Sequence, residues 1–177
     1  LSRCNAHSAA IIRRHNEIVE RLINAARKPP EHRLLINQPI TGISTLRLDI
    51  ILIDDRNKTC AIVDVVVSYE NRSLALWKAR ADKETKYAPI KEAFERKGYN
   101  TSVEAYVVGA LGTMDPLNGG ALKSLGDNHE YNKLMEKLIV SDVIRWARDI
   151  YVEHVTGRRQ YPDKNPQGIR SGNTEAN

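Results

Sequence analysis

The chain has 177 residues, a net charge of +5 and 41% hydrophobic residues. This length and composition allow one domain with a hydrophobic core, or a domain with a small appendage. The positive charge favours a polyanionic partner only weakly. The two cysteines lie far apart in the chain, which excludes a disulfide framework. No segment resembles a membrane span or a signal peptide.

The N-terminal region predicts a polar segment followed by a helix. Because the chain does not begin with Met, we expect it to be part of a longer polypeptide. Residues 1–12 are small, polar and basic, and Cys4 and His7 are spaced like half of a zinc site, which needs four ligands. Apolar residues recur at helical spacing over residues 8–27, and Pro29 marks the helix end.

Three strands are predicted next, over residues 33–40, 46–54 and 59–68. Pro39 places the first strand at an edge or an end of a sheet. The second and third are rich in Ile, Val and Leu, which is typical of strands buried on both faces. Turn-forming residues 55–58 join these two strands and predict a hairpin.

Each strand of this hairpin holds one carboxylate, Asp49 in the first and Asp64 in the second. An ionised Asp in such a strand costs several kcal/mol unless it is paired or binds a metal. A four-residue turn makes Asp54 face Thr59, which predicts Asp49 directly opposite Asp64 with Cβ atoms about 4.5–5.5 Å apart on one face. A turn one residue longer or shorter would place them on opposite faces.

The rest of the chain predicts helices, one more strand and a polar tail. In order, these are a helix over residues 74–87, a break at Pro89, a helical stretch over 90–97, a buried strand over 102–110, a loop with turns near residues 115–120, and a long helix over 130–154. The final residues, 157–177, are predicted to be disordered. This order of elements predicts an α/β fold, with a mixed β-sheet flanked by helices.

The two carboxylates and the helix after them suggest metal-dependent chemistry. Facing carboxylates suit Mg²⁺, which completes its shell with water and phosphate oxygens, polarises a phosphodiester and lowers the pKa of bound water. Lys83, Lys86 and Tyr87 share one helix face. Lys83 is the candidate for stabilising charge or positioning water, and Lys86 and Tyr87 are candidates for holding a flanking phosphate.

Three interpretations stay open from the pattern alone. They are a metal-dependent nuclease, a nucleic-acid-binding protein without catalysis, and a structural protein in which Asp49 pairs with Arg47 or Arg80. The sequence has no phosphate-binding Gly-rich loop, no HExxH motif and no GxSxG motif, and its five histidines show no ligand spacing.

The run LRLDIILID…AIVDVVVSYENRSLALWKARADKETKY resembles the restriction-like endonuclease domain of site-specific non-LTR retrotransposon polyproteins. That family has a variant PD-(D/E)xK core. Its first acid follows a Pro, its second lies in a V-D-V strand, and its lysine lies in a K-x-x-K-Y helix. The matching positions here are Asp49, Asp64, Lys83, Lys86 and Tyr87.

The resemblance extends over roughly residues 3–161. Arg14-His15-Asn16 is similar to the R-H-N motif of the family's first helix, and Arg3-Cys4 is similar to the end of a CCHC zinc knuckle whose other ligands lie upstream. Leu48 departs from the pattern, because the family has Pro there. This change alters the strand entry that aims the first acid and allows for a decayed copy of such an element.

The resemblance implies a domain organisation. The chain is expected to begin with the end of a truncated zinc knuckle over residues 1–12, followed by an endonuclease core over 13–110. A C-terminal loop and long helix packed on the core are expected over 111–156, and a disordered tail over 157–177.

The resemblance also implies an activity. Such domains act in the nucleus and nick double-stranded target DNA hydrolytically with Mg²⁺ or Mn²⁺. The 3′-hydroxyl primes reverse transcription of element RNA by the reverse transcriptase domain of the same polyprotein. The alternative, favoured by Leu48 and the basic charge, is a DNA-binding remnant without cleavage.

Residue roles follow by motif from the same resemblance. Asp49 and Asp64 are the expected metal ligands, and Lys83 is the expected charged or water-positioning group. Supporting roles at the site are expected for four further residues: Lys86, Tyr87, His15 and Asn16. Glu17 is a third possible carboxylate there.

Overall fold

The computed structural model describes residues 8–27, 29–69, 72–126 and 129–161, so Cys4 and His7 of the predicted zinc-knuckle segment lie outside the described residues. The elements in chain order are α1 (Ser8–Ala25), β1 (His32–Ile40), β2 (Ser44–Asp54), β3 (Thr59–Ser68), α2 (Arg72–Glu95), β4 (Asn100–Gly109), η2 (Pro116–Asn118), α3 (Gly119–Ser124) and α4 (His129–Thr156). None of the described helices is both long enough and apolar enough to cross a membrane.

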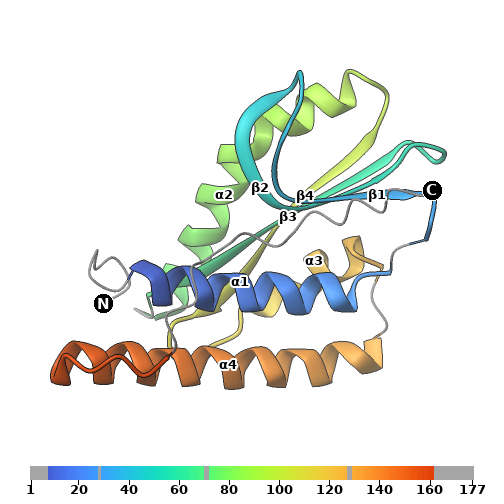
Figure 1. Ribbon diagram of the computed structural model, residues 1–177. Coiled ribbons are helices and arrows are strands. Elements are labelled where there is room, and N and C mark those ends of the chain that lie inside the picture. Colours follow the sequence, from blue (N-terminus) through green and yellow to red (C-terminus); the bar gives the residue numbers. More distant parts are fainter. Residues whose placement is uncertain (1–7, 28, 70–71, 127–128, 162–177) are drawn as a thin grey trace, which may run out of the picture.

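The strands form one mixed sheet in the order β1-β2-β3-β4 (Figure 1). The first three strands are antiparallel, and β4 runs parallel to β3 after the α2 crossover. This arrangement confirms the predicted α/β class with a mixed sheet flanked by helices. Because β1 lies at the edge, Pro39 can occupy it without breaking an interior ladder.

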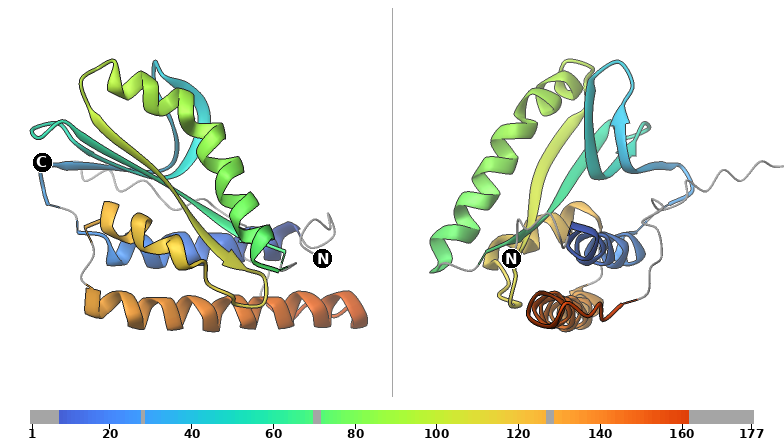
Figure 2. Two further views of the ribbon diagram at one scale, coloured as in Figure 1. Left: turned by 180° about the vertical axis from the view of Figure 1, so that it is seen from behind. Right: turned by 60° about the vertical axis from the view of Figure 1, so that its left-hand side comes forward.

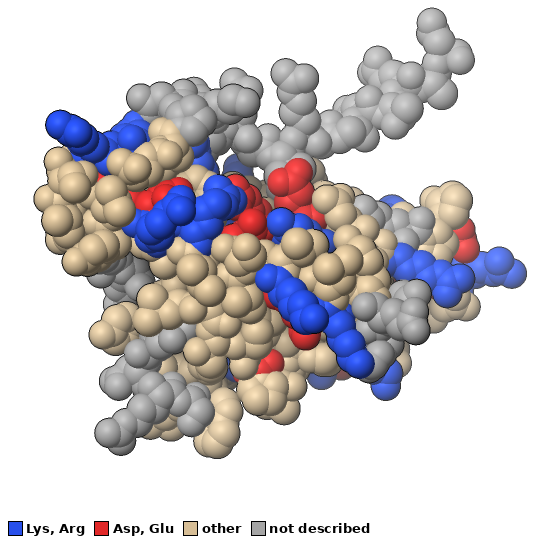
Figure 3. Space-filling view, turned by 90° about the horizontal axis from the view of Figure 1, so that it is seen from below, with Lys and Arg blue, Asp and Glu red and all other residues tan. Residues whose placement is uncertain are grey.

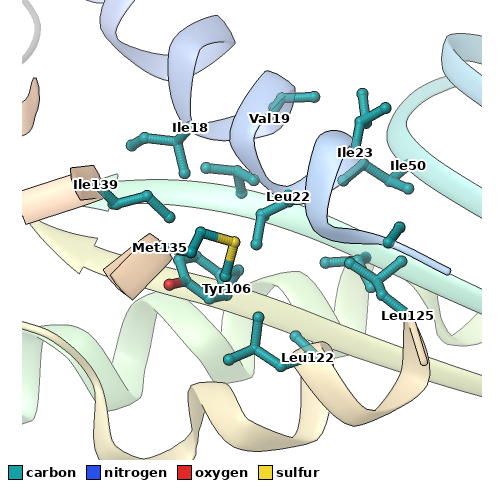
Figure 4. Close-up of a cluster of buried hydrophobic side chains, with 14 of the residues drawn as sticks. Ile18, Val19, Leu22, Ile23, Ile50, Tyr106, Leu122, Leu125, Met135 and Ile139 are labelled. Atoms are coloured by element: carbon teal, nitrogen blue, oxygen red, sulfur yellow. The ribbon is translucent and has the colours of Figure 1, made fainter. Parts of the chain in front are cut away.

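Helices cover both faces of the sheet (Figure 2). On one face, α1, α3 and α4 pack with the sheet around a large apolar cluster that includes Ile18, Leu22, Tyr106, Met135 and Ile139 (Figure 4). On the other face, α2 packs against the sheet around a second cluster. Its buried members are Ile40, Leu48, Ile51, Ile53, Cys60, Ile62, Tyr87, Ile90 and Phe94.

Two predictions for the chain after β3 were wrong. Helix α2 continues through Pro89, where a break was expected, and bends instead (Figure 1). Proline removes one helical hydrogen bond, but Tyr87, Ile90 and Phe94 on both sides of it share one buried cluster that holds the two halves on the sheet. The expected loop near residues 115–120 contains η2 and α3, and the Asp115 side chain caps Leu117 N–H.

Some expected boundaries also differ from the structure. Ser8 to Ile12 form the start of α1, so the expected boundary at residue 12 falls inside a helix. In the expected disordered tail, residues 157–161 are described, and the Tyr161 ring packs on Trp146 at 5.2 Å between centroids. The remainder of that tail, 162–177, lies outside the described residues.

The β2–β3 hairpin has the predicted register, but its pairing stops one step before the two acids. Asp54 pairs with Thr59, and the last pair is Ile50 with Val63. Beyond this point the β1–β2 hairpin leaves the sheet and curls toward α2 (Figure 1), where Leu48 packs in the second cluster. Leu48 and Ile51 occupy the same cluster, so the alternation of side chains fails between them. The sheet therefore divides at Asp49.

Candidate active site

Asp64 is buried beneath α2 and has two close partners on that helix. Its Oδ1 accepts a hydrogen bond of 2.6 Å from the Tyr87 hydroxyl, and its Oδ2 lies 2.6 Å from Lys83 Nζ. Only 2% of Asp64 is exposed. Lys86 Nζ donates to the Tyr87 oxygen at 3.1 Å. The expected i, i+3, i+4 face of the helix is thus the face that contacts the second acid.

Asp49 lies where β2 departs from β3, and its carboxylate fills the gap between the strands. Its Oδ2 accepts a hydrogen bond of 2.8 Å from Val65 N–H and lies 3.0 Å from His15 Nε2. In an unbroken antiparallel ladder, Val65 would pair with the β2 backbone instead. Separation of the strands therefore leaves a backbone donor that the Asp49 side chain satisfies.

The two acids do not share one face as predicted. Asp49 is held from the α1 side by His15, whereas Asp64 is held from the α2 side by Lys83 and Tyr87. The prediction assumed that the ladder extends through both residues, but it ends at the preceding pair. The acids consequently approach one region from the two layers of the fold.

The electrostatics show that these groups influence one another. Burial raises the pKa of Asp64, and the negative charge of Asp49 raises it further, while Lys83 and Tyr87 oppose the shift. Burial alone would lower the pKa of His15, but its hydrogen bond to Asp49 and the charge of that carboxylate raise it overall. Burial and the hydrogen bond to Asp64 raise the pKa of Tyr87, so its hydroxyl stays protonated as a donor.

The donor set contains two carboxylates that could hold a hard divalent cation. Asp64 Oδ2 is buried without a well-directed hydrogen bond, although Lys83 Nζ is close to it. Mg²⁺ uses one or two protein carboxylates and fills its remaining positions with water and phosphate oxygens. Asp49 and Asp64 could supply those carboxylates. No group of three His, Cys, Asp or Glu side chains suited to a metal occurs in the part of the chain that the structure describes.

The R-H-N residues have three different environments. His15 contacts Asp49, and its Nδ1 lies 3.4 Å from the Asn16 side-chain oxygen. Asn16 itself lines a pocket beside Asp49. Arg14 is 4% exposed, its Nε has no hydrogen-bond partner among the described residues, and burial lowers its pKa.

Two side chains considered from the sequence, Glu17 and Arg80, bind partners other than the acids. Glu17 accepts hydrogen bonds of 2.6 Å from Arg145 and from Trp146 of α4, so it does not supply a third carboxylate. Arg80 is buried and bonds to Asp115 at 2.9 Å rather than to Asp49, which ties α2 to the segment after β4.

Leu48, at the position where the resembled family has proline, is fully buried in the second cluster. Its packing therefore supports the strand segment that leads into Asp49.

Asn37 is the site residue that sequence reasoning missed. It lies in β1 between the Gln38–Leu48 and Ile36–Ile50 pairs, so it is across from Asp49. Its φ of 49° is left-handed, and it lines the same pocket as Asp49. Asn is uncommon inside strands and tolerates this conformation better than most residues. An Asn in the middle of an apolar strand was the available signal.

Charges on the α1–α4 side are largely paired. Arg145 binds Glu17, and Arg21 forms an ion pair with Asp142. In Figure 3, which views the molecule from below, Lys and Arg lie in several groups with Asp and Glu beside them and uncharged surface between them. The basic charge is therefore not gathered into one patch on the visible face.

The sequence matches no model of a known protein family, and no curated protein is significantly similar to it.

Proposed function

We propose that this chain is a divalent-metal-dependent DNA endonuclease domain of a non-LTR retrotransposon polyprotein, with a PD-(D/E)xK core. The observation that supports the proposal is that Asp49 binds the backbone of Val65, the neighbour of Asp64 in β3, while Asp64 pairs with Lys83 of α2 at the point where the sheet divides. Two carboxylates whose charges interact and an adjacent ammonium are the groups required for metal-assisted phosphodiester hydrolysis.

Each side chain has a distinct role in this proposal. Asp49 and Asp64 hold Mg²⁺ or Mn²⁺, which when bound polarises the phosphodiester and lowers the pKa of water. Lys83 stabilises the negative charge of the phosphoryl group or positions the attacking water. Tyr87 fixes Asp64 through its hydroxyl, and Lys86 is available to contact a flanking phosphate.

Groups from α1 support the first acid. His15 holds the carboxylate of Asp49 from the side opposite to α2, and the adjacent Asn16 contacts the imidazole. In the parent polyprotein, nicking of double-stranded DNA in the nucleus supplies a 3′-hydroxyl, from which the reverse transcriptase domain copies the element RNA.

A plasmid-nicking assay tests the proposal. Supercoiled plasmid with Mg²⁺ or Mn²⁺ should become nicked in the presence of the wild-type chain, and chelation of the metal should abolish the reaction. Asp64→Asn and Lys83→Met should each lower the rate by about 100-fold, the scale expected on loss of a key charge-stabilising group. Exposed residues on the same helix supply matched controls, Asp82→Asn and Lys78→Met. Equal nicking by wild type and Asp64→Asn would refute the assignment.

A specific observation favours a second candidate, a DNA-binding remnant without cleavage. Each acid already has a close nitrogen partner, Lys83 at 2.6 Å from Asp64 and His15 at 3.0 Å from Asp49. Those contacts compete with a metal for the carboxylate oxygens. This candidate predicts salt-sensitive DNA retention without metal-dependent nicking, so retention and nicking measured on the same preparation separate the two.

A further inference from the structure

A small pocket opens on the α1 side of the acid pair. It has a volume of about 210 Å³, and its lining residues are Ile12, His15, Asn16, Val19, Asn37 and Asp49. This volume is below the range of about 300–1,000 Å³ typical of pockets for drug-sized ligands. It exceeds the roughly 30 Å³ that one water occupies in the liquid by about sevenfold. The pocket therefore has room for one compact chemical group.

The lining of the pocket argues against an anionic occupant. Among the described residues that line it there is no Lys or Arg, and Asp49 contributes a carboxylate. A phosphate placed there would meet the like charge of Asp49, and the one basic side chain in the lining, His15, is already paired with that carboxylate. Ile12 and Val19 provide apolar surface, whereas Asn16 and Asn37 provide amide donors and acceptors. A neutral, flat group with a hydrogen-bonding edge matches this lining, and nucleobases have these properties. Asn side chains pair with base edges, most often adenine.

The backbone at Asn37 brings its amide to this position. Asn37 has a φ of 49°, a left-handed conformation that is uncommon for residues other than glycine and is enriched at functional sites. It lies across from Asp49 at the point where β1 and β2 bend away from the sheet. The same bend thus sets Asp49 against Val65 and makes the pocket wall.

We propose that this pocket receives one nucleobase of the cleaved strand, unstacked from the duplex beside the nicked phosphodiester, with Asn16 and Asn37 contacting its edge. This inference rests on the proposed nuclease function and adds a property of the substrate. Taking a base out of the stack costs a few kcal/mol and costs least when the base is mismatched or already unpaired. The enzyme therefore favours sites where one base next to the nick is easily unstacked.

Fluorescence of 2-aminopurine tests the proposal, because this base brightens when it leaves the stack. The duplex has the sequence of the plasmid region that is nicked most strongly. If no nicking is observed, it has the sequence of the region that the protein retains most strongly in the DNA-retention assay. The analogue is placed at each position in turn, with Ca²⁺ replacing Mg²⁺ to prevent cleavage. Wild type should give a several-fold increase at one position only. Asn37→Gly, which keeps the left-handed backbone, and Asn16→Ala should reduce that increase. Asn24→Ala, exposed on the same helix, should not.

A mismatch placed at the responding position should speed nicking by wild type more than nicking by Asn37→Gly. Normal nicking with no fluorescence increase at any position would overturn the base pocket and leave the nuclease assignment standing. A localised increase that depends on Asn37, without nicking, would support the pocket and overturn cleavage. A fluorescence increase that is unchanged in both Asn37→Gly and Asn16→Ala would overturn the base pocket. Absence of both the fluorescence increase and nicking would overturn both proposals.

Discussion

Tyr87 connects Asp64 to a lysine that lies farther from the carboxylate. Its hydroxyl donates to Asp64 and accepts from Lys86, so it fixes the orientation of the acid without adding charge. We expect Tyr87→Phe to lower metal-dependent nicking by about 10–100-fold, the range seen when an outer partner of a metal ligand is lost. DNA retention in a filter-binding assay should be unchanged. Tyr99→Phe, whose lost hydroxyl donates to Asp55 in the β2–β3 turn and not to Asp64, is the control. Unchanged nicking by Tyr87→Phe would show that Asp64 needs no such support.

Arg14 is a buried guanidinium whose Nε lacks a partner among the described residues. Because burying a poorly compensated charge costs free energy, Arg14→Met should raise the free energy of unfolding by about 1–4 kcal/mol. Urea denaturation monitored by circular dichroism measures the change. Lys133→Met, at an exposed position of α4, should change stability by less than about 0.5 kcal/mol. A loss of stability in Arg14→Met would mean that the guanidinium contributes to the fold.

At the scale of elements, the β2–β3 turn fixes the register that places both acids. Asp54 accepts hydrogen bonds of 2.9 Å from Arg56 N–H and Asn57 N–H, and its other oxygen lies 3.1 Å from His32 Nε2. The hydrogen bonds from Asn57 are the main cause that lowers the pKa of Asp54. A carboxylate with a lowered folded-state pKa contributes stability above its unfolded pKa of 3.8, and loses it as the pH falls through the folded value.

We therefore expect Asp54→Ala to be less stable than wild type at pH 7, with a difference that shrinks as the pH falls below about 4. Thermal unfolding over this pH range measures the difference. The exposed Asp82→Ala is the control and should show little pH-dependent change. A constant difference between wild type and Asp54→Ala at all pH values would contradict a role for the ionised carboxylate.

The packing of Leu48 on α2 holds the strand segment that leads into Asp49. Removal of a large aliphatic side chain from a core costs about 2–5 kcal/mol, so Leu48→Ala should lose stability by that amount. It should also slow nicking at temperatures where it remains folded. Ile53→Ala removes a buried side chain from the same cluster farther along β2. If both variants lose stability and nicking equally, Leu48 has no special role in aiming Asp49.

At the scale of the whole molecule, α4 is part of the hydrophobic core and not an appendage packed on its outside. Met135, Ile139 and Val143 from α4 lie in the same cluster as Ile18 and Leu22 of α1. A chain that ends at Gly126 would expose this surface to water, at about 25 cal/mol per Å² of apolar area. We expect it to lack a cooperative thermal transition, whereas a chain that ends at Tyr161 should retain one. Cooperative unfolding of the shorter chain would show that α4 is not required for a cooperative core.

The sequence by itself determined the features that depend on local spacing. Residues 55–58 determine a four-residue turn, because turn chemistry and strand alternation act over a few residues, and the register follows from it. The spacing of Lys83 and Tyr87 along one helix face likewise determined that both can reach one acid, and both lie at Asp64.

The tertiary structure alone decided where the strands part and which helix residues reach the acids. Pairing ends before Asp49, where Leu48 joins a buried cluster with residues of α2, a segment distant in the chain. The rotation of α1 about its axis places His15 against Asp49 and Glu17 against α4, although only one residue separates His15 from Glu17 in the chain. The rotation of a helix on the sheet is set by the total burial of many apolar side chains. That total depends on partners distant in the chain, so a local sequence pattern does not predict it.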